Sequence, residues 1–198
     1  MQAHSLRLLS AWHPEELRLQ EERRLVGVEQ AILPHLDAAY NLARWLTATD
    51  QDAEDVVQEA CLRAIRFFPG YQGGSARAWL LTIVRRTCYT WLAKNRGQDA
   101  NTASFDEELH SGESDAHDPQ LLLLRRADRQ LIREALEALP VEYREVVVLR
   151  ELEGMSYKEV AQVAEIPLGT VMSRLARGRQ QLEQCLVARL GEEPKRGL

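Results

Sequence analysis

The chain contains 198 residues, of which 25 are Lys or Arg and 30 are Asp or Glu, giving a formal net charge of −5. This length fits one domain or two small ones, and a hydrophobic content of 45% excludes wholesale disorder. No apolar run approaches the roughly 18–20 residues that span a bilayer, and the N-terminus lacks the long apolar stretch of a signal peptide. We therefore expect a soluble, cytoplasmic protein with no membrane insertion.

The cysteines and histidines give no sign of a metal site. Cys61, Cys88 and Cys185 lie far apart and form no CxxC pair, and the five histidines do not show zinc-ligand spacing. We expect reduced thiols on or near helix cores and no bound metal or cofactor. The net negative charge does not exclude a nucleic-acid partner, because the distribution of charge decides that question.

Apolar residues recur every three or four positions from Asp52 to Phe68, which predicts a helix of about four turns with one buried stripe. The stripe consists of Ala53, Val56, Val57, Ala60, Cys61, Ala64, Ile65 and Phe68. The same period predicts an upstream helix with Ile32, Leu36, Ala39, Tyr40, Ala43 and Leu46 inward. A third helix places Leu80, Ile83, Val84, Thr87, Cys88 and Trp91 on one face.

A glycine-rich break, residues 69–76, separates the 52–68 helix from the helix that contains Leu80 and Trp91. The three helices together predict a compact bundle over residues 28–96. Residues 1–27 form an N-terminal extension that is either an amphipathic helix or a loose segment.

An acidic segment follows the bundle. Residues 97–119 contain seven acids, no Lys or Arg, and no apolar period, so they are expected to form a flexible linker. Removing seven negative charges from a net charge of −5 leaves the rest of the chain at +2. Helical patterning then resumes in a second domain over residues 120–188, with a tail at 189–198. Pro140 ends its first helix and Gly154 the next. The expected fold is all-α, with two small helical domains joined by the linker.

Residues 156–182, SYKEVAQVAEIPLGTVMSRLARGRQQL, have the pattern of a helix-turn-helix. Ser156 and Glu159 fit a capping box, and a short break ending at Pro167 precedes a second helix. That helix places Val171, Leu175 and Leu182 inward, and Thr170, Ser173, Arg174 and Arg177 on its other face. A helix of this kind fits the major groove of DNA, about 12 Å wide. A generic helical hairpin with a solvated basic face remains the alternative at this point.

Residues 136–182 resemble region 4 of bacterial sigma factors. The resemblance rests on the A-L-x-x-L-P opening, on E-G-M-S-Y-K-E-V-A and on G-T-V-x-S-R-L. The runs DAEDVVQEACLRAIRFF and ARAWLLTIVRRTCYTWLAKNR resemble region 2 of the same family. Two such regions with a short tether are similar to the extracytoplasmic-function (ECF) group. This resemblance implies a factor that binds core RNA polymerase, recognises −10 and −35 promoter elements and melts the promoter in a stress or envelope response.

The face of the 52–68 helix opposite its apolar stripe is the candidate surface for core polymerase. It carries Asp55, Gln58, Glu59, Leu62 and Arg66. Leu62 is an apolar residue in a polar surface, as a partner interface often requires. In the family this helix docks on the largest polymerase subunit. From the residues alone, a solvated helix face with one stray leucine is the simpler interpretation.

The 76–96 helix and the preceding loop are the candidate −10 site. The helix carries basic residues and no acid, which suits phosphate, while aromatic side chains can stack on unpaired bases. The resemblance implies that the loop captures a flipped base. The candidate residues are Tyr71, Gln72, Ser75, Arg77, Arg85, Arg86, Lys94 and Arg96. Trp79 and Trp91 fit a core role better than a stacking role. For the −35 element the candidates are Lys158, Thr170, Ser173, Arg174 and Arg177.

Two other functions fit the sequence less well. A regulator that uses only the helix-turn-helix needs a sensory or receiver domain, and the N-terminal half lacks alternating strands and helices. A metal enzyme built on Asp50, Asp52, Glu54, Asp55 and Glu59 fails because these positions cannot converge on one ion; capping of the helix by Asp52 explains the cluster more simply. We therefore expect no catalytic residues. The resemblance also implies a partner, an anti-sigma factor that covers the polymerase-binding surfaces.

Overall fold

The computed structural model describes residues 14–47, 49–95 and 129–191, and within these ranges every regular element is helical. The all-α prediction is therefore confirmed. The expected linker, the N-terminal residues 1–13 and the end of the tail lie outside the described residues. The α-helices are α1 (Pro14–Ile32), α2 (Leu36–Thr47), α3 (Asp50–Phe67), α4 (Ala76–Asn95), a helical segment at 129–137, α6 (Val141–Val147), α7 (Tyr157–Ala164) and α8 (Leu168–Gly191).

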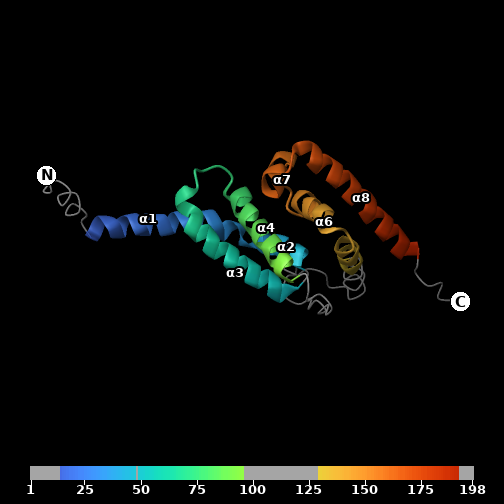
Figure 1. The fold of residues 1–198 in the computed structure, drawn as a ribbon, viewed down its shortest axis with the longest axis horizontal. Coiled ribbons are helices and arrows are strands. Elements are labelled where there is room, and N and C mark those ends of the chain that lie inside the picture. Colours follow the sequence, from blue (N-terminus) through green and yellow to red (C-terminus); the bar gives the residue numbers. More distant parts are fainter. Residues whose placement is uncertain (1–13, 48, 96–128, 192–198) are drawn as a thin grey trace, which may run out of the picture.

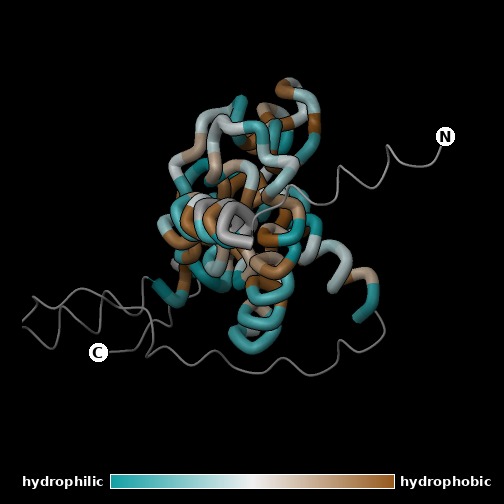
Figure 2. The backbone as a smooth tube through the Cα atoms, turned by 90° about the vertical axis from the view of Figure 1, so that its left-hand side faces the viewer, coloured by the Kyte–Doolittle hydropathy of each residue, from teal (hydrophilic) through white to brown (hydrophobic). Residues whose placement is uncertain are grey.

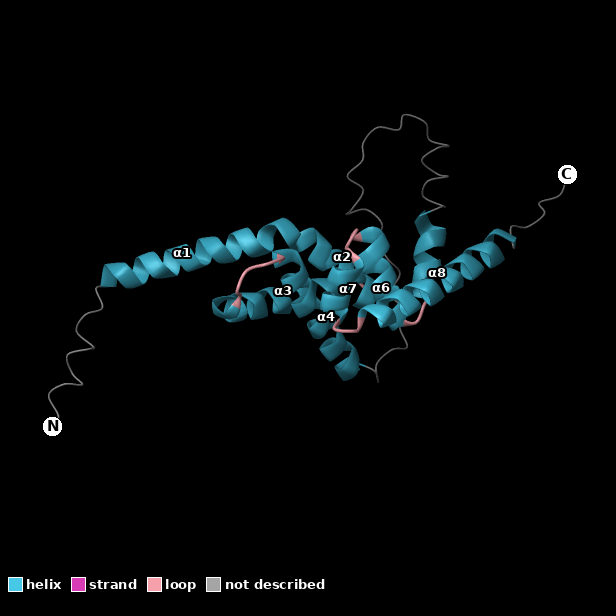
Figure 3. Cartoon of the chain, turned by 90° about the horizontal axis from the view of Figure 1, so that it is seen from above, coloured by secondary structure: helices cyan, strands magenta, loops and turns pink. Residues whose placement is uncertain are grey.

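Helices α2, α3 and α4 pack on one another as the sequence pattern predicts (Figure 1). Their shared core contains alanines that allow close helix approach and leucines that fill the remaining space. The fully buried members include Ala39, Leu42, Ala43, Ala53, Ala60, Leu80, Leu81 and Val84. Helix α1 reaches this core only with its last turns, where Val28 and Ile32 are buried, and its N-terminal part extends beyond the bundle (Figure 3).

The start and the end of α3 differ from the sequence-based expectation. The helix is capped by Thr49, whose hydroxyl accepts a hydrogen bond from the Asp52 backbone N–H at 3.2 Å, so the assignment of Asp52 as the cap was wrong. Ile65, expected in the buried stripe, is 39% exposed. The four buried positions, Ala53, Val56, Ala60 and Ala64, define a narrower stripe than the sequence suggested.

The C-terminal half is built around α6 and α8, which pack against each other with α7 alongside. The expected helix over 141–154 is α6 followed by a wider π turn at Val148–Leu152. Gly154 then takes a left-handed backbone (φ 66°), where glycine avoids the clash that a Cβ would cause. The Met155 N–H closes this end by donating to the Leu149 carbonyl at 3.0 Å.

The two halves pack against each other in the described structure. Helix α4 lies against α7, and α2 against α6, an arrangement visible from two directions (Figures 1 and 3). Buried residues of both halves form one continuous apolar cluster, which includes Leu42 and Val84 from the first half and Val146 and Val163 from the second. Hydrophobic segments accordingly gather where the helices meet (Figure 2).

Gly178 sets how closely α8 approaches α6. A Cβ at this position would lie 2.8 Å from Cγ2 of Val147, and a β-branched side chain cannot move aside easily. We expect Gly178→Ala to lower the free energy of unfolding by about 1–3 kcal/mol through overpacking, although alanine has a helix propensity roughly 1 kcal/mol better than glycine.

Urea unfolding followed by circular dichroism measures this effect. Gly169→Ala, on the same helix, is the matched control, because its Cβ would meet nothing within 4 Å. The control should be neutral or stabilising by up to about 1 kcal/mol. Equal effects of the two substitutions would contradict a close packing of α8 on α6.

Candidate nucleic-acid and polymerase interfaces

The outer face of α3 combines charged residues with exposed apolar ones. Asp55, Gln58, Glu59, Leu62 and Arg66 are all exposed, and the Leu62 side chain is 59% exposed. Sequence reasoning missed a further member of this surface, Ile65, which is 39% exposed. Phe67, 55% exposed, lies at the end of the helix on a different side from Leu62. The spacing of Ile65 three residues after Leu62 could have indicated a shared face. The C-terminal end of α3 therefore carries an apolar patch within a polar surface.

The loop between α3 and α4 holds Tyr71 in an aromatic cluster. The Tyr71 ring centroid lies 4.9 Å from that of Trp79 and 5.8 Å from that of Phe68, and its hydroxyl donates to the Gly74 carbonyl at 2.8 Å. Trp79 is half-buried and packs against the core, consistent with the structural role expected for it. Tyr71 thus supports the loop from inside and is only partly open to a base.

Gln72 and Ser75 lie on the exposed side of the same loop. The Ser75 hydroxyl accepts a hydrogen bond from the Ala78 N–H at 3.2 Å, at the start of α4. Between the two residues, Gly73 and Gly74 both take left-handed backbone angles, φ 90° and 93°. Gln72 is therefore open to solvent-borne ligands, while Ser75 is partly committed to the helix start.

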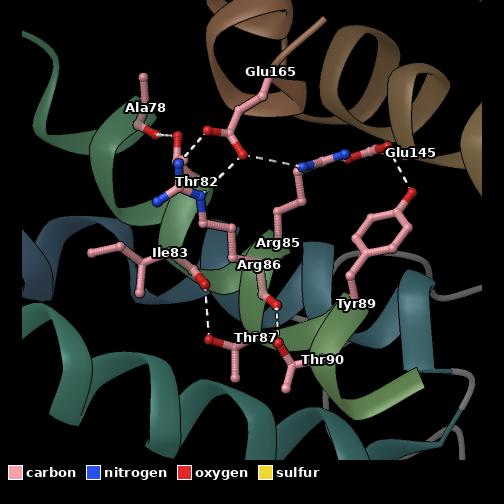
Figure 4. Close-up of polar contacts among 10 residues, drawn as sticks. All are labelled: Ala78, Thr82, Ile83, Arg85, Arg86, Thr87, Tyr89, Thr90, Glu145 and Glu165. Atoms are coloured by element: carbon pink, nitrogen blue, oxygen red, sulfur yellow. Dashed lines mark hydrogen bonds and ion pairs between the residues drawn. The ribbon is translucent and has the colours of Figure 1, made fainter. Parts of the chain in front are cut away.

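Three basic residues of α4 bind carboxylates of the C-terminal half, and Figure 4 shows two of them, Arg85 and Arg86. Arg77 pairs with Glu153, and Arg85 pairs with Glu145. Arg86 binds Glu165, with Nε 3.0 Å from Oε2. Lys94 is exposed near the end of α4, and Arg96 lies outside the described residues. The structure thus gives Arg77, Arg85 and Arg86 each an acidic partner that the sequence did not indicate.

Glu145 is the centre of this contact. Its side chain is fully buried, and it accepts hydrogen bonds from Arg85 and, at 3.0 Å, from the Tyr89 hydroxyl. The Arg85 guanidinium also lies over the Tyr89 ring, 4.7 Å from its centroid. Burial raises the pKa of the Glu145 carboxyl, while attraction and hydrogen bonding from Arg85 oppose that rise. Burial and the nearby carboxylate together raise the pKa of Tyr89.

The helix-turn-helix has the capping box that the sequence predicts. The Ser156 hydroxyl accepts from the Glu159 N–H at 3.3 Å, and the Glu159 carboxylate accepts from the Ser156 N–H at 2.8 Å. The hydrogen bonds from Ser156 lower the pKa of the Glu159 carboxyl. Val160 and Val163 are buried on the inner side of α7, and Val171 and Leu175 on that of α8.

The turn between α7 and α8 contains Glu165 in a left-handed conformation, with φ 55°. Its carboxylate points to α4 and binds Arg86, which lowers the pKa of the Glu165 carboxyl. The Pro167 carbonyl accepts hydrogen bonds from the Thr170 and Val171 N–H groups at 2.8 and 3.1 Å and so begins α8. The break expected at Glu165–Pro167 is confirmed.

The candidate −35 residues lie along α7 and the first half of α8. Lys158, Ser173 and Arg177 are exposed, whereas Thr170 and Arg174 are half-buried. The charge of Arg174 is near enough to Glu145 and Tyr89 to oppose the rise that burial causes in the pKa of each, so Arg174 belongs to the contact between the halves as well. Leu168 and Met172, 41% and 52% exposed, add apolar surface to this part of α8; their spacing of four residues is the signal that sequence reasoning overlooked.

The described residues contain no cluster of three or more His, Cys, Asp or Glu side chains able to hold a metal ion. Within the same ranges, no helix has both the length and the apolar character needed to cross a membrane. The three cysteines are free; Cys88 is buried, which raises the pKa of its thiol to about 12. A helical bundle with a basic helix and a helix-turn-helix are together the features of a class of nucleic-acid-binding proteins.

Known proteins resemble this chain in both halves. Residues 31–98 match the family described as Sigma-70 region 2, and residues 129–182 match Sigma-70, region 4. The ECF RNA polymerase sigma factor SigE of Mycolicibacterium smegmatis is 35% identical over 83% of this chain and 63% of its own length. The RNA polymerase sigma-H factor of Pseudomonas aeruginosa is 33% identical over 72% of this chain and 77% of its own length.

Solved structures give the same result. The sigma factor RpoE in complex with the anti-sigma factor NepR from Bartonella quintana is 28% identical, with a TM-score of 0.63, over 80% of this chain and 96% of that one. CnrH in complex with the cytosolic domain of CnrY is 25% identical, with a TM-score of 0.57, over 81% of this chain and 88% of that one. The chain belongs to the sigma-70 family of RNA polymerase sigma factors, in its ECF group.

The capping box provides a local test of the helix-turn-helix. We expect Ser156→Ala to lower the free energy of unfolding by about 1 kcal/mol, because the first N–H groups of α7 lose their acceptor. The contribution of Glu159 is fully present above the ordinary glutamate pKa, about 4.3. It is lost as the pH falls through the lower folded-state value, so the difference between wild type and variant should narrow there.

Urea unfolding at neutral pH and at successively lower pH values measures this difference. Gln162→Ala, an exposed position in the same helix, is the control and should change little. A wild-type advantage that grows on acidification would contradict the role assigned to Glu159.

Proposed function

We propose that this chain binds core RNA polymerase and directs transcription initiation at promoters with paired −10 and −35 elements. The observation that carries this proposal is the presence, in one chain, of a region 2 bundle with a basic α4 and a region 4 helix-turn-helix. The relatives named as RNA polymerase sigma factors support it. The chain spans 63% of the length of the M. smegmatis relative, so its activity and partners are assigned from the matched regions alone.

The outer face of α3 is the proposed contact with core polymerase. Its exposed apolar side chains, Leu62 and Ile65, stand among charged residues, and this mixture is typical of the core and rim of a protein interface. Asp55, Gln58, Glu59 and Arg66 form the polar part of the surface.

Helix α4 and the preceding loop are the proposed contact with the −10 element. Arg77, Arg85 and Arg86 provide positive charge along one side of the helix, which suits the phosphates of a separated strand. Lys94 and Arg96 extend this charge toward the helix end. Gln72, Ser75 and the partly exposed Tyr71 offer hydrogen bonds and a ring face to a base that leaves the stack during melting.

Helix α8 is the proposed reading helix for the −35 element. Thr170, Ser173, Arg174 and Arg177 lie near its N-terminal end, the end that enters the major groove in helix-turn-helix proteins. Arginine pairs well with guanine edges or with phosphate. Lys158 on α7 is positioned to meet the adjacent backbone.

The functional domains are residues 28–96 and 120–188, with an extension at 1–27, a linker at 97–119 and a tail at 189–198. The protein acts in the cytoplasm, where RNA polymerase works, and has no catalytic chemistry of its own. It takes part in a stress or envelope response.

An anti-sigma factor is the proposed regulator. The solved relatives RpoE and CnrH were each captured with a partner, in the first case the anti-sigma factor NepR. The similarity to RpoE covers 80% of this chain. Neither described half alone is that long, so the similarity includes both halves. A partner that binds both halves at once would hold them in a single arrangement.

Sequencing the transcripts made on genomic DNA by core polymerase with and without this protein tests the proposal. New transcripts should start a fixed distance downstream of two shared sequence elements. An unchanged set of transcripts, or failure of the chain to bind core polymerase, would overturn the proposed function.

Variants of α8, the proposed reading helix, can be tested on the strongest promoter found in this way. Arg174→Ala and Arg177→Ala should each weaken binding at the upstream element by about 1–3 kcal/mol if that arginine contacts a base. Footprinting of the polymerase complex measures the loss. Arg129→Ala, which removes an exposed arginine from the 129–137 segment, is the control; an unchanged footprint in the double variant would show that α8 is not the reading helix.

Leu62 tests the polymerase surface. We expect Leu62→Ala to weaken binding to core polymerase by about 1–2 kcal/mol, because a central apolar side chain of an interface is removed. Competition against the unlabelled wild type measures the change. Val187→Ala, at a 64% exposed apolar position on α8, should bind like wild type, and equal behaviour of the two variants would place the docking surface elsewhere.

A further inference from the structure

Two apolar side chains, Leu168 and Met172, remain exposed at the start of α8. They are 41% and 52% exposed, and their spacing of four residues places them next to each other on the helix surface. The packing of α8 does not use them, because Val171 and Leu175 supply its buried side at 0% and 1% exposure. The folded chain therefore presents Leu168 and Met172 outward.

The exposed surface of this part of α8 consists of two neighbouring rows, since side chains four residues apart line up on a helix. The apolar row consists of Leu168, Met172 and Ala176. The polar row beside it consists of Gly169, Ser173 and Arg177. All six positions are exposed. An apolar strip thus runs alongside residues that are already proposed to contact the −35 element.

The charge around the apolar row suits DNA. Helix α8 carries no acidic residue before Glu183, whereas Arg177 and Arg179 flank the apolar row on its two sides. The Arg179 guanidinium is held by Glu151, with Nε 3.0 Å from Oε1, and its side chain stays 49% exposed. Cations beside an uncharged strip fit the major groove, because phosphates border the groove and base edges lie within it.

The methyl group of thymine is the apolar feature that base pairs present in the major groove. Every base pair shows hydrogen-bond donors or acceptors there, and thymine adds a methyl group at C5. Methionine adapts well to such a group because its side chain is unbranched, flexible and polarizable. A cytosine at the same place would turn its N4 amino group toward Met172, where this donor would find only the weak acceptor of a thioether.

We propose that Met172, supported by Leu168, selects thymine in the −35 element through its 5-methyl group. The polar row provides hydrogen bonds and attraction to phosphate, while the apolar row packs against the methyl groups of one or two thymines. Apolar contact thus adds base specificity that phosphate attraction cannot provide, because that attraction is independent of sequence. This inference deepens the proposed function of α8 and rests on it.

Replacing thymine by uracil tests this assignment one methyl group at a time. Uracil keeps the Watson–Crick pairing and the O4 acceptor and lacks only the 5-methyl group. The complex of core polymerase with the full-length protein is bound to the promoter identified by transcript sequencing, with each thymine of the upstream element replaced in turn on either strand. We expect one or two replacements to weaken binding about fourfold, the effect of losing one buried methyl group. Competition footprinting of the upstream element measures the change.

Two variants of Met172 separate an apolar contact from a general loss of binding. Met172→Gln should bind the thymine and uracil duplexes equally at the sensitive position, whereas Met172→Leu keeps an apolar side chain and should retain most of the fourfold difference. Val187→Gln, at a 64% exposed apolar position of the same helix, is the matched control and should behave like wild type. Circular dichroism checks that each variant keeps its helices.

Failure of thymine selection can be distinguished from failure of the proposed function. Equal binding of all uracil duplexes by the wild type, or an upstream element without thymine on either strand, would overturn thymine selection. Methyl sensitivity that persists unchanged in Met172→Gln would overturn the role of Met172. Loss of core polymerase binding in Met172→Gln would show that the apolar row docks on protein and would overturn it as well. Absence of any upstream footprint with the wild type would instead contradict the proposed function of α8, and thymine selection with it.

Discussion

The burial of the Glu145 carboxylate is the constraint on which the arrangement of the two halves depends. Taking a carboxylate out of water costs several kcal/mol, and here the two donors that offset this cost, Arg85 and Tyr89, belong to the other half of the chain. Partial separation would leave Glu145 without those donors and without full hydration. The structure therefore favours two end states, one with the halves packed and one with the carboxylate in water, over intermediate positions.

The ion pairs determine how the two halves are aligned more than they add to the free energy of packing them together. Pairs at a protein surface contribute about 0–1 kcal/mol, and a buried pair roughly balances its desolvation. Favourable free energy for closure comes instead from apolar residues such as Val146, Val148 and Leu149, which are buried in a cluster shared with α2 and α4. The contact between the halves is thus held mainly by apolar burial, while the ion pairs determine which residues meet.

Local features of the fold were predictable from the sequence, and contacts between distant residues were not. The helical period identified α2, α3, α4 and α8, and the S-x-x-E pattern identified the Ser156–Glu159 capping box, because each signal lies within a few residues. The pairing of Arg85 with Glu145 joins positions 60 residues apart, and no periodicity contains that information. The exposure of Ile65 likewise depends on where α3 leaves its neighbours. The candidate site residues stay predictions, and the acidic partners of Arg77, Arg85 and Arg86 became visible only in the folded chain.

Glu165 shows how the contact is built into the helix-turn-helix itself. A non-glycine residue in the left-handed region costs about 1–2 kcal/mol, and glycine would remove that cost at this turn. The ion pair that Glu165 forms with Arg86 is partly exposed on both sides, so solvent screening reduces its contribution to less than the backbone penalty. The residue therefore does not stabilise the turn. Its effect is to hold a negative charge against an arginine of α4, at the point where the turn between α7 and α8 meets the proposed DNA-binding face. The feature that makes the C-terminal half a helix-turn-helix, a tight break before the reading helix, is thus also the feature that carries an anion to the other half.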